Sequence, residues 1–68
     1  MENLGEKLKS LRIDRGWTQS KMGERFSVSQ DTVSLWERNK SLPDLGVVVL
    51  LCREFCVSAD WLLGLEED

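Results

Sequence analysis

Histidine is absent from this sequence of 68 residues, and cysteine occurs only twice. Without histidine, the most common general base and metal ligand are missing, and no glycine-rich phosphate loop or nucleophile–base set can be assembled. Cys52 and Cys56 stand four residues apart, a spacing that suits neither an intrachain disulfide nor, without histidine, a zinc site. The sequence therefore predicts no enzyme, no metal, no cofactor and no small-molecule substrate.

Long apolar runs are also lacking. The longest, from Val47 to Cys52, is too short to span a bilayer, and no basic and apolar signal pattern opens the chain. Hydrophobic residues make up 41% of the sequence and charged residues 31%, as is typical of soluble globular proteins. We expect a single cytoplasmic domain over residues 1–68, without a membrane partner. In it Cys52 and Cys56 are buried as small hydrophobic residues, or Cys56 senses oxidants.

The net charge of −3 is unevenly distributed along the chain. Residues 1–41 carry eight Lys/Arg and six Asp/Glu, whereas residues 42–68 carry one Arg and six Asp/Glu, half of them in an acidic tail at residues 66–68. A polyanion responds to the face that it meets more than to the overall charge. The distribution permits a mildly basic face in the N-terminal part, and a solvated surface of mixed charge is the alternative.

Five short helices are predicted, and no alternating apolar pattern is long enough for a strand, so the expected fold class is all-α. The first helix should run to about Arg15, with Gly16 as its stop. Each helix follows a residue whose side-chain oxygen can accept a hydrogen bond from the first turn. These predicted N-caps are Asn3 (with Glu6 completing a capping box), Thr18, Ser29, Asp44 and Ser58.

Apolar residues at helical spacing predict the core. Trp17, Trp36 and Trp61 all fall at apolar positions, so we expect them in the core and not as platforms that stack on bases. The other side chains expected to point inward are Leu4, Leu8, Leu11, Met22, Phe26, Val33, Leu45, Val48, Leu51, Cys52, Phe55 and Leu62.

Residues 18–38 contain two of these helices, separated by only about three residues at Phe26–Ser29. Helices joined so closely cross at a steep angle and form a helix-turn-helix. Because helices this short are marginal in water, the neighbouring helices must hold the pair in place. One face of the second helix, Gln30–Arg38, can then stay free.

Four motifs occur in order, "LGEKLKSLRIDRGWTQ", "VSQDTVSLWERNK", "LPDL" and "VSADWLLG", over about Leu4–Gly64. In these motifs the chain resembles the phage-repressor/Cro-type helix-turn-helix family, or XRE family, of transcription regulators. The resemblance implies a compact five-helix bundle that binds double-stranded DNA, usually as a homodimer on an inverted-repeat operator. It implies a sequence-specific transcriptional regulator, a repressor, which reads the major groove with the helix Gln30–Arg38.

The resemblance also implies roles for particular residues. Gln19 matches a glutamine that contacts a backbone phosphate, and Gln30 matches one that reads a base and supports Gln19. Arg12 and Glu37 match a salt bridge that ties the first helix to the recognition helix. Lys40 stands where backbone contacts are common.

The remaining recognition-surface candidates face away from Val33 on the predicted helix. Ser34 can donate to a base or accept from one. Asp31 either accepts from a cytosine or stabilises the helix N-terminus, and Leu35 either contacts a thymine methyl or is incidentally exposed. Arg38 reaches a phosphate or a guanine, or is merely solvated. The N-caps Thr18 and Ser29 would hold backbone N–H groups toward phosphates, a role compatible with capping alone.

The sequence departs from the family pattern at four positions. Ser27 and Cys56 replace glycines, so each either takes a left-handed backbone at a cost of about 1 kcal/mol or lies in a different turn. Asn39 also replaces a glycine but tolerates that conformation. Gly23 replaces an alanine and keeps the small side chain that close packing needs.

An apolar surface near the C-terminus suggests a dimer interface, with a slightly sticky monomer as the alternative. A second class of function also stays open, a helix-turn-helix protein-interaction module such as an antitoxin or a complex subunit. Steep salt dependence would distinguish DNA binding from it. The candidate dimer residues are Val47, Leu50, Trp61, Leu63 and Leu65.

Overall fold

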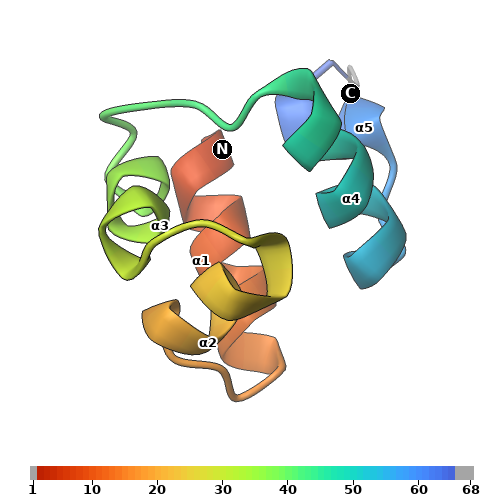
Figure 1. Ribbon diagram of the computed structural model, residues 1–68. Coiled ribbons are helices and arrows are strands. Elements are labelled where there is room, and N and C mark those ends of the chain that lie inside the picture. The colour runs from red at the N-terminus through yellow and green to blue at the C-terminus, as the bar shows by residue number, and fades with distance from the viewer. Residues whose placement is uncertain (1, 66–68) are drawn as a thin grey trace.

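The computed structural model describes residues 2–65, and Figure 1 shows how their helices are arranged. The helices are α1 (Leu4–Asp14), α2 (Gln19–Phe26), α3 (Gln30–Glu37), α4 (Leu45–Phe55) and α5 (Ala59–Leu63). Residues 2–65 contain no strand, so the all-α five-helix prediction is confirmed for them. The predicted acidic tail, residues 66–68, lies outside the described residues.

The predicted N-caps are confirmed at every helix. At α1, the Glu6 N–H donates to Asn3 Oδ1 at 2.9 Å and the Asn3 N–H donates to Glu6 Oε1 at 3.1 Å, which completes the capping box. Each such cap is worth about 1 kcal/mol to a helix that is too short to be stable alone. The other caps are Thr18, Ser29, Asp44 and Ser58.

Within residues 2–65, three non-glycine residues have a left-handed backbone. Ser27 (φ 59°) ends α2, Cys56 (φ 56°) ends α4, and Asn39 (φ 59°) follows α3. The turns therefore keep the geometry that a glycine would favour, and Ser27 and Cys56 bear its cost. At the end of α4 this backbone leaves the Cys56 thiol exposed, so the expectation that Cys56 is buried is wrong.

The core forms where the inward stripes of the helices meet. Val33 and Trp36 of α3 are buried as expected, while Trp17 and Trp61 are half-buried and pack against the core. Leu45 was expected inward but is 80% exposed, because it lies at the first turn of α4 and to one side of the buried stripe. The remaining buried apolar residues are Leu8, Met22, Phe26, Val48, Leu51, Phe55 and Leu62.

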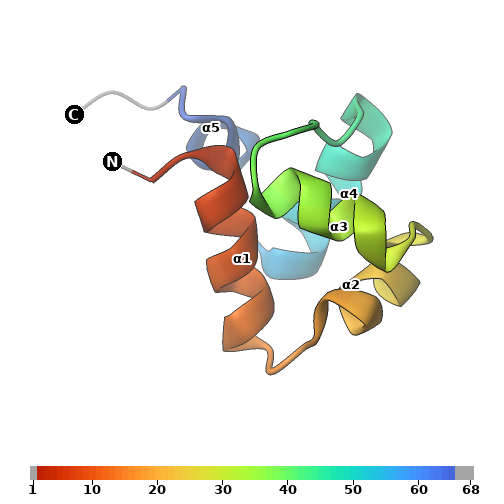
Figure 2. The ribbon, with the colours of Figure 1, turned by 90° about the vertical axis from the view of Figure 1, so that its left-hand side faces the viewer.

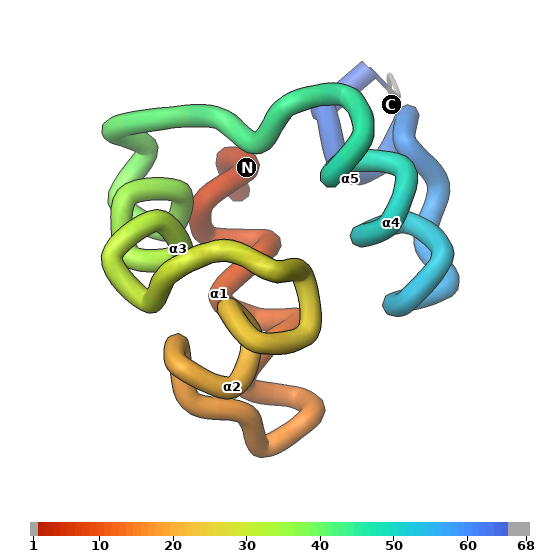
Figure 3. The backbone as a smooth tube through the Cα atoms, in the orientation of Figure 1, coloured from red at the N-terminus to blue at the C-terminus, as the bar shows by residue number. Residues whose placement is uncertain are grey.

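The helices form two groups in Figure 1, with α1, α2 and α3 together and α4 beside α5. Residues 38–44 connect α3 to α4 across one end of the molecule, as Figure 3 traces. Figure 2 shows the start of α1 beside α5. There Lys7 is buried, with only 7% of the residue exposed. Its ammonium group donates to the Trp61 carbonyl oxygen at 2.5 Å and lies 4.9 Å from the centre of the Trp61 ring. This contact joins α5 to α1.

Glu54 of α4 joins three helices on the side away from Lys7. Its carboxylate accepts from Arg15 at 2.8 Å and from Arg25 at 2.5 Å, and its backbone carbonyl accepts from Arg15 at 2.7 Å. The Arg15 guanidinium also lies over the rings of Phe55 and Trp17, at 4.8 Å and 5.4 Å. The ends of α1 and α4 are thereby fixed to α2.

This ion-pair cluster predicts a dependence of stability on pH. Hydrogen bonds from Arg15 and then Arg25 lower the pKa of the Glu54 carboxyl below its ordinary value of 4.5. The unfolded chain then binds the proton more readily, so the contribution of Glu54 is complete above pH 4.5 and is lost as the pH falls through the folded-state pKa. Thermal unfolding between pH 6 and pH 3 should show that Glu54→Gln is less stable than wild type at pH 6 and that the gap narrows on acidification.

The matched control for this prediction is Glu24→Gln, at an exposed carboxylate of α2 whose ion pair with Lys21 is long, 3.9 Å. Its unfolding temperature should follow that of the wild type at every pH. A constant gap between Glu54→Gln and wild type over the whole range would contradict the assignment.

Candidate nucleic-acid interface

A bidentate ion pair joins α1 to α3. Arg12 Nε lies 2.6 Å from Glu37 Oε2, and Arg12 Nη2 lies 3.2 Å from Glu37 Oε1. The third guanidinium nitrogen, Nη1, donates to the Trp17 carbonyl oxygen at 2.8 Å, just before α2 begins. The two side chains are only 12% and 4% exposed, so solvent screens the pair little. Arg12 and Glu37 thus orient α3 relative to α1 and to the start of α2.

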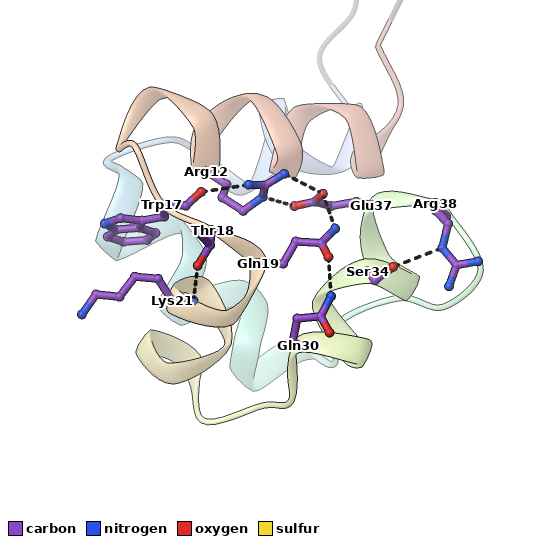
Figure 4. Close-up of polar contacts among 9 residues, drawn as sticks. All are labelled: Arg12, Trp17, Thr18, Gln19, Lys21, Gln30, Ser34, Glu37 and Arg38. Carbon is purple, nitrogen blue, oxygen red and sulfur yellow. Dashed lines mark hydrogen bonds and ion pairs between the residues drawn. The ribbon is translucent and has the colours of Figure 1, made fainter.

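Two glutamines continue this contact to the outer surface. Gln19 Nε2 donates to Glu37 Oε1 at 3.0 Å, and Gln30 Nε2 donates to Gln19 Oε1 at 2.6 Å. Figure 4 shows the resulting chain of hydrogen bonds from Arg12 to Gln30. We call these four residues, Arg12, Glu37, Gln19 and Gln30, the polar relay. Because Glu37 is buried and Gln30 is exposed, the polar relay runs from the interior to the surface.

The relay leaves the outer end of Gln30 with unused hydrogen-bonding capacity. Gln30 Nε2 gives one N–H to Gln19, while its second N–H and its oxygen have no partner within residues 2–65. A side-chain amide with one donor and one acceptor available matches the N6 and N7 groups of adenine in the major groove. Because Gln19 fixes the amide, little side-chain freedom remains to be lost on contact.

The N-caps of α2 and α3 lie on the same surface as the two glutamines. Thr18 Oγ1 accepts from the Lys21 N–H at 3.0 Å, and Ser29 Oγ accepts from the Thr32 N–H at 3.1 Å. The Thr32 hydroxyl also pairs with that of Ser29 at 2.9 Å, a contact that the sequence did not predict. Capping therefore occupies these hydroxyls, and the N–H groups at the first positions of each helix stay available to an anion.

The outward side of α3 carries the other predicted residues. Asp31 is exposed in the first turn, Ser34 is half-buried and Leu35 is 37% exposed. The helix ends at Glu37, one residue before the predicted end, and Arg38 is its C-cap. Arg38 and Lys40 are both exposed at this end. The helix surface is thus acidic at its start and basic at its end.

Asn39 has a structural role that the sequence analysis missed. Its Nδ2 donates to Asn3 Oδ1 at 2.9 Å, and its Oδ1 accepts from the Gly5 N–H at 3.0 Å. Both bonds fasten the end of α3 to the first turn of α1. The sequence signalled only the left-handed backbone at Asn39, because both partners are more than thirty residues away along the chain.

Few cations are available to a polyanion. Arg12, Arg15 and Arg25 pair with carboxylates, and Lys7 is buried. On the surface formed by α2 and α3, exposed cations remain at Lys21, whose ion pair is long and exposed, and at Arg38 and Lys40. The basic face predicted from the charge distribution is therefore small.

The candidate dimer residues fall into two groups. Leu50, Leu63 and Leu65 are exposed, together with Leu45 and Val49, which the sequence analysis did not select. Val47 and Trp61 are half-buried and pack against the core. Val47 borders the buried stripe of Val48 and Leu51, which explains why it packs against the core.

Neither a metal-binding cluster nor a membrane-spanning helix occurs in the described part of the chain. Residues 2–65 contain no group of three or more Cys, Asp or Glu side chains that is arranged to hold a metal ion. Within the same residues, no helix has the length and hydrophobicity needed to cross a membrane.

Five capped helices with a short α2–α3 pair define the helix-turn-helix class of bundle. A family model described as helix-turn-helix matches residues 8–62. The chain therefore belongs to the helix-turn-helix family of the phage-repressor/Cro (XRE) type.

Three relatives illustrate the relationship. The chain is 34% identical over 65 residues to the HTH-type transcriptional regulator ImmR of Bacillus subtilis, covering 96% of this chain and 51% of ImmR. The P22 c2 repressor, solved in complex with a synthetic operator, superposes with a TM-score of 0.84 at 27% identity, covering 93% of this chain and 96% of that chain. SinR, a master regulator for biofilm formation solved in complex with DNA, superposes with a TM-score of 0.73 at 25% identity. The superposition covers 87% of this chain and 95% of the SinR chain. The chain thus spans about half the length of ImmR.

Proposed function

We propose that the chain binds double-stranded DNA at a specific operator sequence and regulates transcription as a repressor. The observation that carries this proposal is the polar relay, which fixes the Gln30 amide on the outer side of a helix that its neighbours hold outward. The P22 c2 repressor and SinR, whose folds this chain shares, were solved with DNA. Membership of a family of transcription regulators, and the absence of histidine, favour binding over catalysis.

The dimensions of α3 suit the major groove. Eight residues of α-helix are about 12 Å long, and the groove of B-DNA is about 12 Å wide. With α3 in the groove, Gln30 contacts a base through its available donor and acceptor. Asp31 and Leu35 lie beside it, where a cytosine amino group and a thymine methyl group would be their respective partners.

Backbone phosphates would be bound around this helix. Gln19 opens α2 and Gln30 opens α3, and the first N–H groups of both helices favour anions. Thr18 and Ser29 hold these turns by capping, and Lys40 supplies a flexible positive charge after α3. Contacts of this kind set the register of the protein on DNA, while base contacts set the sequence preference.

We extend the proposal to a homodimer on an inverted-repeat operator. The apolar surface of exposed Leu50, Leu63 and Leu65, bordered by Val47 and Trp61, would be covered by the same surface of a second copy. Two-fold symmetry would place the recognition helices about 34 Å apart, one turn of DNA.

A helix-turn-helix protein-interaction module, such as an antitoxin or a complex subunit, is the second candidate. The exposed leucines of α4 and α5 and the net charge of −3 favour it. A protein-interaction module would not explain why a buried ion pair orients Gln19 and Gln30. We therefore prefer DNA binding.

Selection from a random duplex pool, followed by affinity measurements at several salt concentrations, tests the proposal. We expect a palindromic consensus with half-sites one turn apart. If Lys21 and Lys40 each neutralise a phosphate, log K should fall with log salt at a slope of about −2 per bound copy. An apolar protein interface would show no such slope, and a pool without enrichment would refute the proposal.

Single substitutions sharpen the salt measurement. Lys40→Ala should weaken binding to all sequences alike and make the salt slope shallower by about one. Arg53→Ala removes an exposed cation from α4, outside the α2–α3 surface, and should leave the slope unchanged. Equal slopes for wild type and Lys40→Ala would show that Lys40 does not contact the backbone.

A further inference from the structure

Arg38 differs from the other arginines of the α1–α3 group because no carboxylate binds it within residues 2–65. Arg12, Arg15 and Arg25 form ion pairs with Glu37 or Glu54. The side chain of Arg38 instead makes a single hydrogen bond, from Nε to Ser34 Oγ at 3.2 Å. Its charge is therefore not neutralised by the part of the chain that the structure describes.

The contact with Ser34 holds this side chain along the helix. Arg38 is the C-cap of α3, and its backbone N–H also donates to the Ser34 carbonyl oxygen at 3.0 Å. Both the backbone and the side chain of Arg38 are thus fixed on Ser34, one turn earlier. Figure 4 shows the side-chain contact. Bonding through Nε leaves the Nη1 and Nη2 groups, the two parallel donors of the guanidinium, without a partner in the described residues.

Ser34 and Arg38 continue the surface stripe that begins at Gln30. Positions 30, 34 and 38 follow one another at successive turns and so share one side of the helix. At 1.5 Å per residue, the first and last of them are about 12 Å apart along the axis, which corresponds to three or four base pairs. Gln19 fixes Gln30 at the start of the stripe, and Ser34 fixes Arg38 at its end.

A guanine suits this arrangement better than a phosphate does. A phosphate can be reached by any flexible cation near the helix end, and exposed Lys40 lies two residues further on. Ser34 holds the Arg38 guanidinium against the side of α3 that carries Gln30. There its two parallel donors match guanine O6 and N7.

We infer that Arg38 is a base-reading residue specific for guanine and that Ser34 is its positioning residue. This inference rests on the proposed function and adds a preference to it. Each half-site should contain an adenine, bound by Gln30, and a guanine, bound by Arg38, three or four base pairs apart. Asp31 and Leu35 would contact the base pairs between them.

Selection of operators from random duplexes by three variants tests this inference, after circular dichroism has shown that each is as helical as the wild type. Arg38→Lys keeps the charge and loses the parallel donors, so the guanine preference should fall about tenfold to a hundredfold while the adenine preference persists. Ser34→Ala should weaken the same preference, since only the orientation of Arg38 is lost. Ser34→Thr keeps a hydroxyl and should retain the guanine preference.

Other results would contradict the inference in separable ways. If Arg38→Lys selects the same guanine as strongly as the wild type, the parallel donors of Arg38 do not read that base and the inference fails, although DNA binding stands. If Ser34→Ala retains the full guanine preference that Arg38→Lys loses, the positioning role of Ser34 fails. If the wild type selects no sequence at all, the proposed function itself fails.

Discussion

Replacing Arg12 with alanine is expected to lower the free energy of unfolding by about 3 kcal/mol, because it leaves the Glu37 carboxylate buried without its cation. Glu37 would keep only the hydrogen bond from Gln19, and the Trp17 carbonyl would lose its donor. Operator binding should fall by about tenfold or more at temperatures where the variant is folded, since Gln19 and Gln30 lose their fixed support. Urea unfolding and duplex titration measure the two effects.

The control for this prediction is Lys9→Ala, which removes an exposed cation from the same helix. Exposed charges contribute little to stability, so its free energy of unfolding should lie within about 0.5 kcal/mol of wild type. If Arg12→Ala were as stable as Lys9→Ala and bound the operator equally well, the relay would have no role in orienting α3.

Replacing Gly5 with alanine should destabilise the fold by about 2 kcal/mol although alanine favours helices. A methyl group at this position would lie 2.6 Å from the carbonyl oxygens of Trp36 and of Glu37, and 2.8 Å from Asn39 Nδ2. Backbone atoms cannot rotate away as a flexible side chain can, so α1 must move off the end of α3. Thermal and urea unfolding measure the loss.

Gly46→Ala provides a matched comparison in α4. There the nearest neighbour of an added methyl would be Asp44 Oδ1, at 3.4 Å, which is an ordinary contact. This variant should be unchanged or slightly more stable, because alanine restricts the unfolded chain and favours the helix. A Gly5→Ala variant as stable as Gly46→Ala would show that α1 and α3 are not in close contact.

Features set by neighbouring residues were predictable from the sequence. A cap requires one oxygen-bearing side chain before a helix, so all N-caps could be located. For Ser27 and Cys56 the resemblance left two alternatives, a left-handed backbone or a different turn, and the structure has the first. The buried positions of α3 followed from helical spacing. The resemblance to a family paired Arg12 with Glu37, which spacing alone could not have done.

Features that depend on how helices meet were not predictable. The contacts of Asn39 with Asn3, of Lys7 with Trp61 and of Glu54 with two arginines all join residues far apart in the sequence. The periodicity of α4 also misplaced Leu45, which lies at the first turn and to one side of the buried stripe. At position 23 even the methyl group of alanine would not fit, since it would lie 2.6 Å from the Val28 carbonyl oxygen.

In the proposed function, the neighbouring helices hold α3 outward so that its polar side contacts base pairs. This arrangement is tested most directly by titrating the isotopically labelled chain with the selected operator and, separately, with a scrambled duplex of the same composition, and following the amide resonances. We expect the side-chain amides of Gln19 and Gln30 and the backbone amide of Ser34 to shift strongly with the operator and only weakly with the scrambled duplex. Resonances of these three residues that stay unchanged, or that respond equally to both duplexes, would contradict it.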